Sequence, residues 1–313
     1  MPKTARVILN PTSGGGRGGR STGAILAGLE RRGISAEIRA TTAPREAAAL
    51  ALAAAREGVD IVVAAGGDGT VHEVANGLLR GREEEGLDGT VLGVLPVGTG
   101  NDFAKLVGPL KQFEASLDIL AAGAVRRLDA GRALWRDEAH WFVNAAGTGI
   151  DVEVVRQILL RRGGSGPAVA KYLLAVLRAL VRYRPIPLRI RMDDRVLEAD
   201  VMIVAAANGR CIGGGFWVCP AAEPDDGRFD ICIVRRTSFL EALWAIPLIL
   251  RGVHERHPKV EMHRAKGVDI EALGAAPLFF QLDGELHEPP DVRSIRFEVV
   301  PGALPVLASP EAA

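Results

Sequence analysis

The stretch from Ile61 to Thr70 constrains the fold of this chain more than any other, because an apolar run ends abruptly at glycines that surround one carboxylate. The run itself is rich in β-branched and small apolar residues, which is typical of a buried parallel strand. The residues after it, Val71–Leu78, have helical spacing. Asp68 is therefore expected on a tight turn at a helix N-terminus, where glycines admit a ligand and amide groups favour an anion such as phosphate.

Two other segments place a similar turn after a strand. Arg6–Asn10 is expected to be the first strand, and the glycine-rich segment Pro11–Arg20 separates it from a helix over about Ser21–Arg32. Val91–Pro96 is another apolar run, and it leads into the glycine, hydroxyl and carboxylate turn Val97–Asp102. In an open parallel sheet such turns share the edge at which ligands bind. Together they predict a phosphate-binding edge, and an acid beside phosphates is explained by a metal ion that bridges them.

The chain changes character after the strand–helix alternation of residues 1–128. From residue 129 onward short alternating runs predominate, which indicates an antiparallel β domain with helical insertions. Helices are expected over Pro44–Glu57 in the first part and Ala168–Arg184 in the second. With 313 residues, 48% of them apolar, the chain is long enough for two domains with substantial cores.

Charge and hydropathy exclude several classes of protein. The formal net charge is zero, so no global field attracts nucleic acid, and no nucleic-acid partner is expected. The sequence starts a strand almost at once, without the pattern of a signal peptide, and no apolar run reaches the ~20 residues that span a bilayer. Three cysteines lack the spacing of a zinc site. These features predict a cytoplasmic protein.

At this point the motifs resemble a known family, the diacylglycerol kinase catalytic-domain family, and within it the bacterial soluble lipid kinases most of all. The resemblance spans nearly the whole chain, in order and with family-like spacing. It is carried by Asn10-Pro11-x-Ser13-Gly14, Gly66-Gly67-Asp68-Gly69-Thr70, Pro96-x-Gly98-Thr99-x-Asn101-Asp102 and Asp283-Gly284-Glu285.

The resemblance implies a fold of two domains. Residues 1–128 would form an α/β nucleotide-binding domain with a parallel sheet, like that of NAD kinases and diacylglycerol kinases. Residues 129–299 would form an antiparallel β-sandwich domain for the lipid substrate. The C-terminal residues 300–313 are expected to return to the first domain.

The resemblance also implies transfer of the γ-phosphoryl group of ATP to the hydroxyl of a lipid such as diacylglycerol. Thr42 adjoins Thr41 and is the alternative to it, and His72 stands where many relatives have Asn, which leaves the nucleotide preference open. The implied nucleotide contacts are Asn10, Pro11, Thr12, Ser13, Gly14, Thr41, Gly67, Asp68, Gly69, Thr70, Val71, His72, Glu73 and Thr99.

By the same resemblance, Asp68 holds or orients Mg²⁺ on the phosphates, and Glu285, with Asp283 beside it, accepts the proton of the attacking hydroxyl. The glycine between the two acids permits a turn that brings both to one site. A plain turn is the alternative interpretation of this segment. Which of Asp283 and Glu285 is the base stays open.

A segment of the second half resembles the family's magnesium-binding segment. It would supply the carboxylate of Asp226 and the main-chain oxygens of Glu223 and Arg228, and a hard cation accepts such ligands. A polar hairpin turn is the alternative. Whether such a metal site is structural or regulatory is open.

Two rival functions remain. An NAD-kinase-like kinase of a soluble metabolite shares the Gly66–Thr70 motif, but the Asn10 and Pro96 motifs disfavour it. A non-catalytic nucleotide or lipid sensor of the same fold is the other rival, and the intact acids Asp68, Asp283 and Glu285 disfavour it.

A basic segment predicts peripheral contact with the inner face of the membrane. Val154–Met192 contains no Asp or Glu, and within the helix expected there Lys171, Arg178 and Arg182 form a narrow stripe. A helix packed inside the second domain is the alternative. The family resemblance also leaves a homodimer open. The nine basic residues of the segment are Arg156, Arg161, Arg162, Lys171, Arg178, Arg182, Arg184, Arg189 and Arg191.

Overall fold

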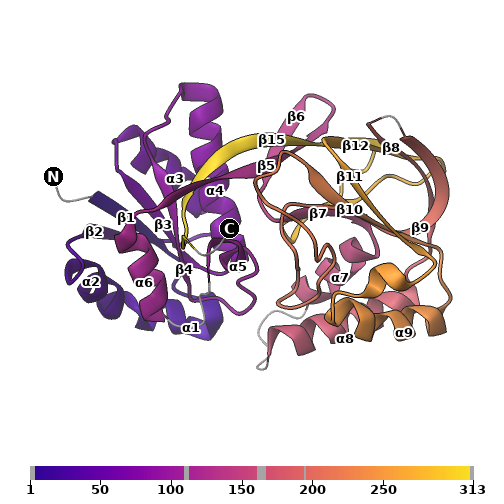
Figure 1. The fold of residues 1–313 in the computed structure, drawn as a ribbon, viewed down its shortest axis with the longest axis horizontal. Helices are drawn as coiled ribbons and strands as arrows, with labels where there is room; N and C mark the ends of the chain where they lie inside the picture. The colour runs from indigo at the N-terminus through magenta and orange to yellow at the C-terminus, as the bar shows by residue number, and fades with distance from the viewer. Residues whose placement is uncertain (1–3, 109–112, 161–166, 194, 311–313) are drawn as a thin grey trace. The chain divides into compact units, whose positions relative to one another are not determined.

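The computed structural model describes residues 4–108, 113–160, 167–193 and 195–310 (Figure 1). The chain divides into two compact units. Unit 1 comprises Met1–Leu128 and Gly302–Ala313, and unit 2 comprises Asp129–Pro301. Arg161 and Arg162, two of the basic residues noted in the sequence, lie outside the described residues.

Unit 1 is built on a parallel sheet. Its strand order is β15–β4–β3–β1–β2. The central strand β3 is buried along its whole length, as its apolar composition predicts. The strands are β1 (Thr4–Leu9), β2 (Ser35–Ala40), β3 (Ile61–Gly66), β4 (Val91–Pro96) and the end of β15 (Ser294–Leu307). The helices are α1 (Ser13–Arg20), α2 (Thr22–Glu30), α3 (Glu46–Arg56), α4 (Asp68–Glu85), α5 (Ala104–Val107) and α6 (Phe113–Ala122).

The strand register brings the carboxyl ends of β1, β3 and β4 together. Leu9 pairs with Ala65, and Gly66 pairs with Pro96. The predicted shared edge is therefore confirmed. The last residues of β15 join this sheet, because Val306 pairs in parallel with Leu92.

The glycine-rich segment after β1 is more ordered than a loop. The prediction placed the first helix at about Ser21–Arg32, whereas α1 already begins at Ser13 and α2 ends at Glu30. Within α1, Gly14, Gly15 and Gly16 have φ angles of 61°, 72° and 84°, so the chain is kinked there. Glycine adopts this left-handed region without the steric penalty of a Cβ, which explains the run of glycines.

Unit 2 is an antiparallel β domain, as its alternating runs predict, and it is a β-sandwich, as the family resemblance implies. One path of paired strands runs β14–β13–β7–β9–β8–β12–β15, β10 pairs with both β9 and β11, and β6 pairs with β5. The strands are β5 (Val125–Trp135), β6 (Glu138–Phe142), β7 (Ala145–Gly149), β8 (Ile186–Met192), β9 (Arg195–Ala207), β10 (Phe229–Arg235), β11 (Val260–Ala265), β12 (Gly267–Ala272), β13 (Phe280–Leu282) and β14 (Glu285–His287).

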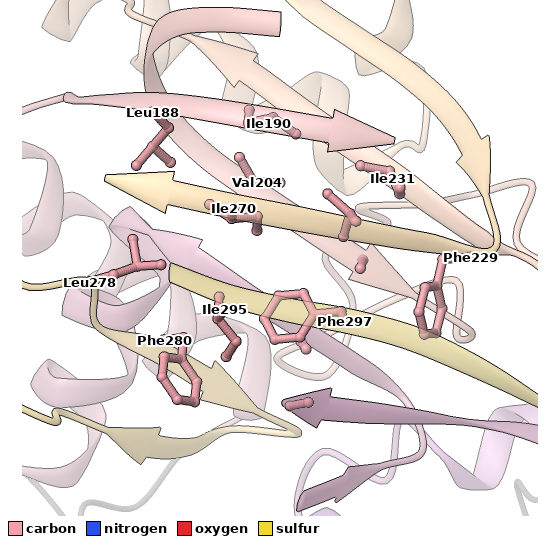
Figure 2. Close-up of a cluster of buried hydrophobic side chains, with 14 of the residues drawn as sticks. Leu188, Ile190, Val204, Phe229, Ile231, Ile270, Leu278, Phe280, Ile295 and Phe297 are labelled. Atoms are coloured by element: carbon pink, nitrogen blue, oxygen red, sulfur yellow. The ribbon is translucent and has the colours of Figure 1, made fainter. Parts of the chain in front are cut away.

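The core of unit 2 is formed by apolar side chains from strands far apart in the sequence (Figure 2). The rings of Phe142 and Phe229 stack with centroids 5.4 Å apart, and Phe297 meets Phe142 edge-on at 5.7 Å. All three side chains are fully buried. Such aromatic pairs contribute about 0.5–1.5 kcal/mol beyond the burial of their area.

The helices of unit 2 are α7 (Ile150–Leu159), α8 (Ala168–Arg182), α9 (Phe239–Leu250) and the short 3₁₀ helix η1 (His254–Arg256). Helix α8 contacts both α7 and α9. It ends two residues earlier than predicted because Tyr183 is already extended, and Pro185 two residues further on disfavours helical conformation at Arg184. In the part of the chain that the structure describes, no helix is long and apolar enough to cross a membrane.

Candidate functional site

The glycine turns after β1, β3 and β4 touch one another. A Cβ added to Gly98 would lie 2.3 Å from the Cα of Gly67, and one added to Gly14 would lie 2.3 Å from the carbonyl oxygen of Val97. No side chain fits at such distances. At Gly98 and Gly14 the absence of a side chain therefore lets neighbouring turns pack together.

Hydrogen bonds hold the turns in place. The guanidinium of Arg17 donates to the carbonyl oxygen of Gly98 at 2.7 Å, and Asn10 Nδ2 donates to Thr70 Oγ1 at 3.4 Å. Asn10 Oδ1 in turn accepts from the backbone and hydroxyl of Thr12. Side chains from widely separated segments thus form one edge, with the glycine run of α1 beside it.

Asp68 is the first residue of α4 and lies partly buried at this edge. Its Oδ1 accepts a hydrogen bond from the backbone N–H of Phe103 at 3.0 Å, so it joins the turn after β3 to the turn after β4. Burial, and next the carboxylate of Asp102, raise the pKa of Asp68 to about 6, which backbone N–H donors only partly offset. Asp102 is itself buried and forms an ion pair with Lys105 at 2.6 Å.

This arrangement fits a divalent cation. Two carboxylates close enough to raise a pKa favour a positive charge between or beside them. Among the described residues, no group of three or more His, Cys, Asp or Glu side chains could hold a metal by itself. A magnesium ion bound here would therefore take most of its ligands from phosphates and water, which is its usual behaviour in nucleotide sites. Asp102 was part of a quoted motif but was not predicted as a site residue.

The remaining predicted nucleotide contacts differ in their surroundings. Thr41 extends β2 and donates its N–H to the carbonyl of Leu9 at 2.9 Å, at the end of β1, whereas the Thr42 hydroxyl is bonded to Glu46. Thr99 is exposed and Val71 is buried, so Val71 is expected to meet a ligand only through its backbone. Pro11, Ser13, Gly69 and His72 are half-buried.

Glu73 has a structural task in this unit. Its carboxylate accepts the backbone N–H groups of Arg45 at 3.2 Å and Ala47 at 3.1 Å, which are the unpaired donors at the start of α3. A carboxylate at a helix N-terminus is favoured by both hydrogen bonding and the helix dipole. A direct nucleotide contact by Glu73 stays a prediction.

In unit 2, the two acids of the turn Asp283–Glu285 have different hydrogen-bond partners. Asp283 has a φ of 51°, and its carboxylate accepts the backbone N–H groups of Val143, Asn144 and Ala145 at 2.8–2.9 Å. Glu285 begins β14 and is half-buried, and no described residue donates a hydrogen bond to its carboxylate. Asp283 thus holds the turn in place, and a role of Glu285 as the base stays a prediction.

Two residues that the sequence interpretation missed support this turn. Gln281 Oε1 accepts the N–H of Gly284 at 2.7 Å, and its Nε2 donates to Oδ2 of Asp151 at 3.3 Å. Asp151 is buried in the first turn of α7, and burial raises its pKa to about 7. The pairing joins residues that are 130 positions apart, so no local pattern could have revealed it.

Stability is expected to depend on pH through Asp151. Between its ordinary pKa of 3.8 and its folded value of about 7, the folded protein holds a proton that the unfolded chain has released. The free energy of unfolding therefore falls as pH rises through this range, by at most about 1.4 kcal/mol per pH unit for this group. Urea unfolding of wild type and Asp151→Asn across that range should show a shallower slope for the variant. Parallel slopes would contradict the assignment. The slope is the readout because Asp151 accepts hydrogen bonds at both oxygens, from Gln281 and from the N–H of Val152, and Asn has only one oxygen to accept them.

In the structure, an arginine from β11 lies beside the carboxylate of the predicted metal segment around Asp226. Asp226 Oδ1 accepts the N–H of Arg228 at 2.9 Å, and the guanidinium of Arg264 forms an ion pair with the same carboxylate. Burial, and next Glu223, raise the pKa of nearby Asp230 to about 6. Arg264 supplies positive charge beside Asp226 and Asp230. Binding of a metal by Glu223, Asp226 and Arg228 stays a prediction.

A parallel α/β unit whose strands end in touching glycine turns, followed by an antiparallel β-sandwich, defines the class of diacylglycerol kinase-like folds. A crystal structure of a diacylglycerol kinase from Bacillus anthracis str. Sterne superposes on the whole chain with a TM-score of 0.73 and 22% identity, covering 98% of that structure. Another crystal structure from the same strain gives a TM-score of 0.78.

Sequence comparison then shows the family. Residues 4–133 match the diacylglycerol kinase catalytic domain, and residues 144–308 match the YegS C-terminal NAD kinase beta sandwich-like domain. The diacylglycerol kinase of Mycobacterium tuberculosis (strain ATCC 25618 / H37Rv) is 33% identical over 96% of this chain and 93% of its own length. That of Bacillus subtilis (strain 168) is 30% identical over 90% of both. The chain belongs to the diacylglycerol kinase catalytic-domain family, a family of lipid kinases, as the motifs predicted.

Proposed function

We propose that this protein transfers the γ-phosphoryl group of ATP to the hydroxyl of a diacylglycerol-like lipid. The contact of the three glycine turns around Asp68 carries the proposal most directly, because it gathers backbone amides, Arg17 and a carboxylate at one sheet edge. Relatives named diacylglycerol kinase support the choice of acceptor.

Each residue has a proposed task. The α1 segment and the turns after β3 and β4 bind the phosphates of ATP, since amide groups and the N-terminus of α4 favour anions. Asp68 orients Mg²⁺, which supplies charge neutralisation on the phosphates when bound. Glu285 accepts the proton of the lipid hydroxyl as the phosphoryl group leaves ATP, and Asp283 and Gln281 hold the turn that carries it.

A kinase assay separates this proposal from the two rivals. The purified protein is incubated with γ-labelled ATP, Mg²⁺ and, in separate reactions, diacylglycerol, phosphatidylglycerol, a sphingoid base and NAD. Label is expected on a lipid, with diacylglycerol the best acceptor. Label on NAD would make the protein a soluble-metabolite kinase, and ATP binding without transfer to any acceptor would make it a sensor. Asp68→Asn serves as the matched inactive control.

A further inference from the structure

Helix α9 presents large apolar side chains to solvent. Leu240 is 75% exposed and Trp244 is 62% exposed, and one turn spacing places them on the same face. Phe239 at the start of the helix is 47% exposed. The helix is well formed at this end, because Ser238 and Glu241 make a reciprocal capping box. Neighbouring large apolar side chains on an ordered surface indicate a site of interaction.

Arginines frame this apolar face at both ends. Arg236 lies three residues before α9 begins, whereas Arg251, the C-cap residue of α9, follows the exposed Pro247 by four, so Arg251 continues the helical stripe. Both side chains are exposed. Arg236 has a single long ion-pair contact, 3.5 Å to Asp200, and no described carboxylate forms an ion pair with Arg251.

Helix α8 lies beside α9 in the same unit and adds more positive charge (Figure 1). Lys171 and Arg182 are exposed and Arg178 is half-buried, and none of the three forms an ion pair with a described residue. Leu174 and Val181 between them are 46% and 63% exposed. The sequence of α8 contains no acidic residue.

Not all basic residues of the segment Val154–Met192 contribute to this surface. Arg156 forms ion pairs with Glu153 and Glu288, and Arg189 bridges Glu198 and Glu271. Acids from distant parts of the chain neutralise these two arginines. Among the described residues, Lys171, Arg178 and Arg182 of α8 and Arg251 at the end of α9 form no ion pair, and neither do Arg184 and Arg191 of the same segment.

We propose that the exposed faces of α8 and α9 form a docking surface for an anionic phospholipid bilayer. Phe239, Leu240 and Trp244 enter the boundary between headgroups and acyl chains, and the lysine and arginine side chains of the surface bind lipid phosphates. Tryptophan suits this boundary because its ring is apolar and its N–H is polar. The positive charge of these side chains complements the negative charge of anionic headgroups. The proposal rests on the proposed function, because the lipid acceptor of such a kinase stays in the bilayer.

Co-sedimentation with vesicles tests the surface independently of catalysis. Wild type is expected to bind vesicles of phosphatidylcholine and phosphatidylglycerol in a salt-sensitive manner, and to bind phosphatidylcholine vesicles weakly. Arg178→Glu/Arg182→Glu is expected to bind at least about 10-fold more weakly, since each basic residue contributes about fivefold. Leu240→Ser/Trp244→Ser is also expected to bind at least about 10-fold more weakly.

A matched control comes from β9 of the same unit. Arg195 and Val196 are exposed, Val196 by 62%, and neither lies on the two helices. Arg195→Glu/Val196→Ser is expected to bind like wild type. Because all substituted side chains are exposed or half-buried, thermal unfolding should be nearly unchanged in every variant. Equal vesicle binding by wild type and both helix variants would overturn the proposal, as would wild type that ignores anionic vesicles.

Fluorescence and activity complete the test. Quenching of tryptophan by brominated lipid should be strong in wild type and should largely disappear in Trp244→Phe, which is expected to keep vesicle binding. Helix variants should lose activity on diacylglycerol in vesicles and keep it on a short-chain soluble diacylglycerol. Binding without kinase activity would leave the docking surface intact and refute only the proposed function. A change from dimer to monomer in the helix variants, with vesicle binding unchanged, would instead assign the surface to a second copy of the chain.

Discussion

Asp68→Asn is expected to abolish phosphoryl transfer, a loss of at least about 10³-fold, and at the same time to stabilise the ligand-free protein at neutral pH. Asn keeps an oxygen that accepts the N–H of Phe103, so the turn stays in place. What is lost is the negative charge that we propose orients Mg²⁺. Because the pKa of Asp68 is raised to about 6, its ionised form destabilises the folded state above that pH. Removing the charge should add about 1–2 kcal/mol to the free energy of unfolding.

The size of this stability gain depends on pH. The folded pKa lies above the ordinary value of 3.8, so the gain is full above pH 6 and vanishes below about pH 4. Chemical unfolding at pH 7.5 and at pH 4, with kinase assays at saturating Mg²⁺, measures both effects. Asp137→Asn, in the exposed turn between β5 and β6, is the matched control. Unchanged turnover of Asp68→Asn would remove Asp68 from the proposed mechanism.

Glu285→Gln is expected to lower turnover by about 10²–10⁴-fold, the range for loss of a general base, with ATP affinity and stability nearly unchanged. The reason is structural as well as chemical. No described residue donates a hydrogen bond to the Glu285 carboxylate, so the turn does not need its charge. Steady-state kinetics, ATP binding and thermal unfolding provide the three measurements.

Asp283→Asn is the informative comparison. Its carboxylate accepts three backbone N–H groups, and the amide of Asn would turn a donor toward one of them. We expect a loss of about 2–4 kcal/mol in the free energy of unfolding, together with lower turnover. The double variant should be non-additive in turnover because both residues belong to one site, in which Asp283 holds the turn that carries Glu285. A fully stable, inactive Asp283→Asn beside an active Glu285→Gln would make Asp283 the base.

The fold was largely predictable because its signals are local. An apolar β-branched run such as Ile61–Ala65 indicates a buried strand, and the glycine turn after it marks where the strand ends. The meeting of the turns at one edge follows from the geometry of a parallel sheet, which makes it predictable without knowing any contact. The boundaries of α1 and α2 were less accurate, since three successive glycines have no conformational preference that fixes a helix start.

The candidate site was only partly predictable, because its support comes from contacts between distant residues. The pairing of β13 with β7 brings Gln281 to Asp151. It also brings the carboxylate of Asp283 to the backbone N–H groups of residues 143–145. The effect of Asp102 on Asp68 likewise requires that two turns touch. The exposure of Leu240 and Trp244 is also invisible in sequence, where α9 resembles an ordinary core helix.

Because of β15, unit 1 can complete its sheet only with residues that are synthesised after unit 2. Residues 1–128 leave the ribosome first, yet Val306 pairs with Leu92 of β4, and Leu304, Val306 and Leu307 are buried. During synthesis of unit 2, which takes roughly 10–35 s at usual elongation rates, the nascent unit 1 carries an open sheet edge. The unit that is translated first is therefore the one that completes its folding last.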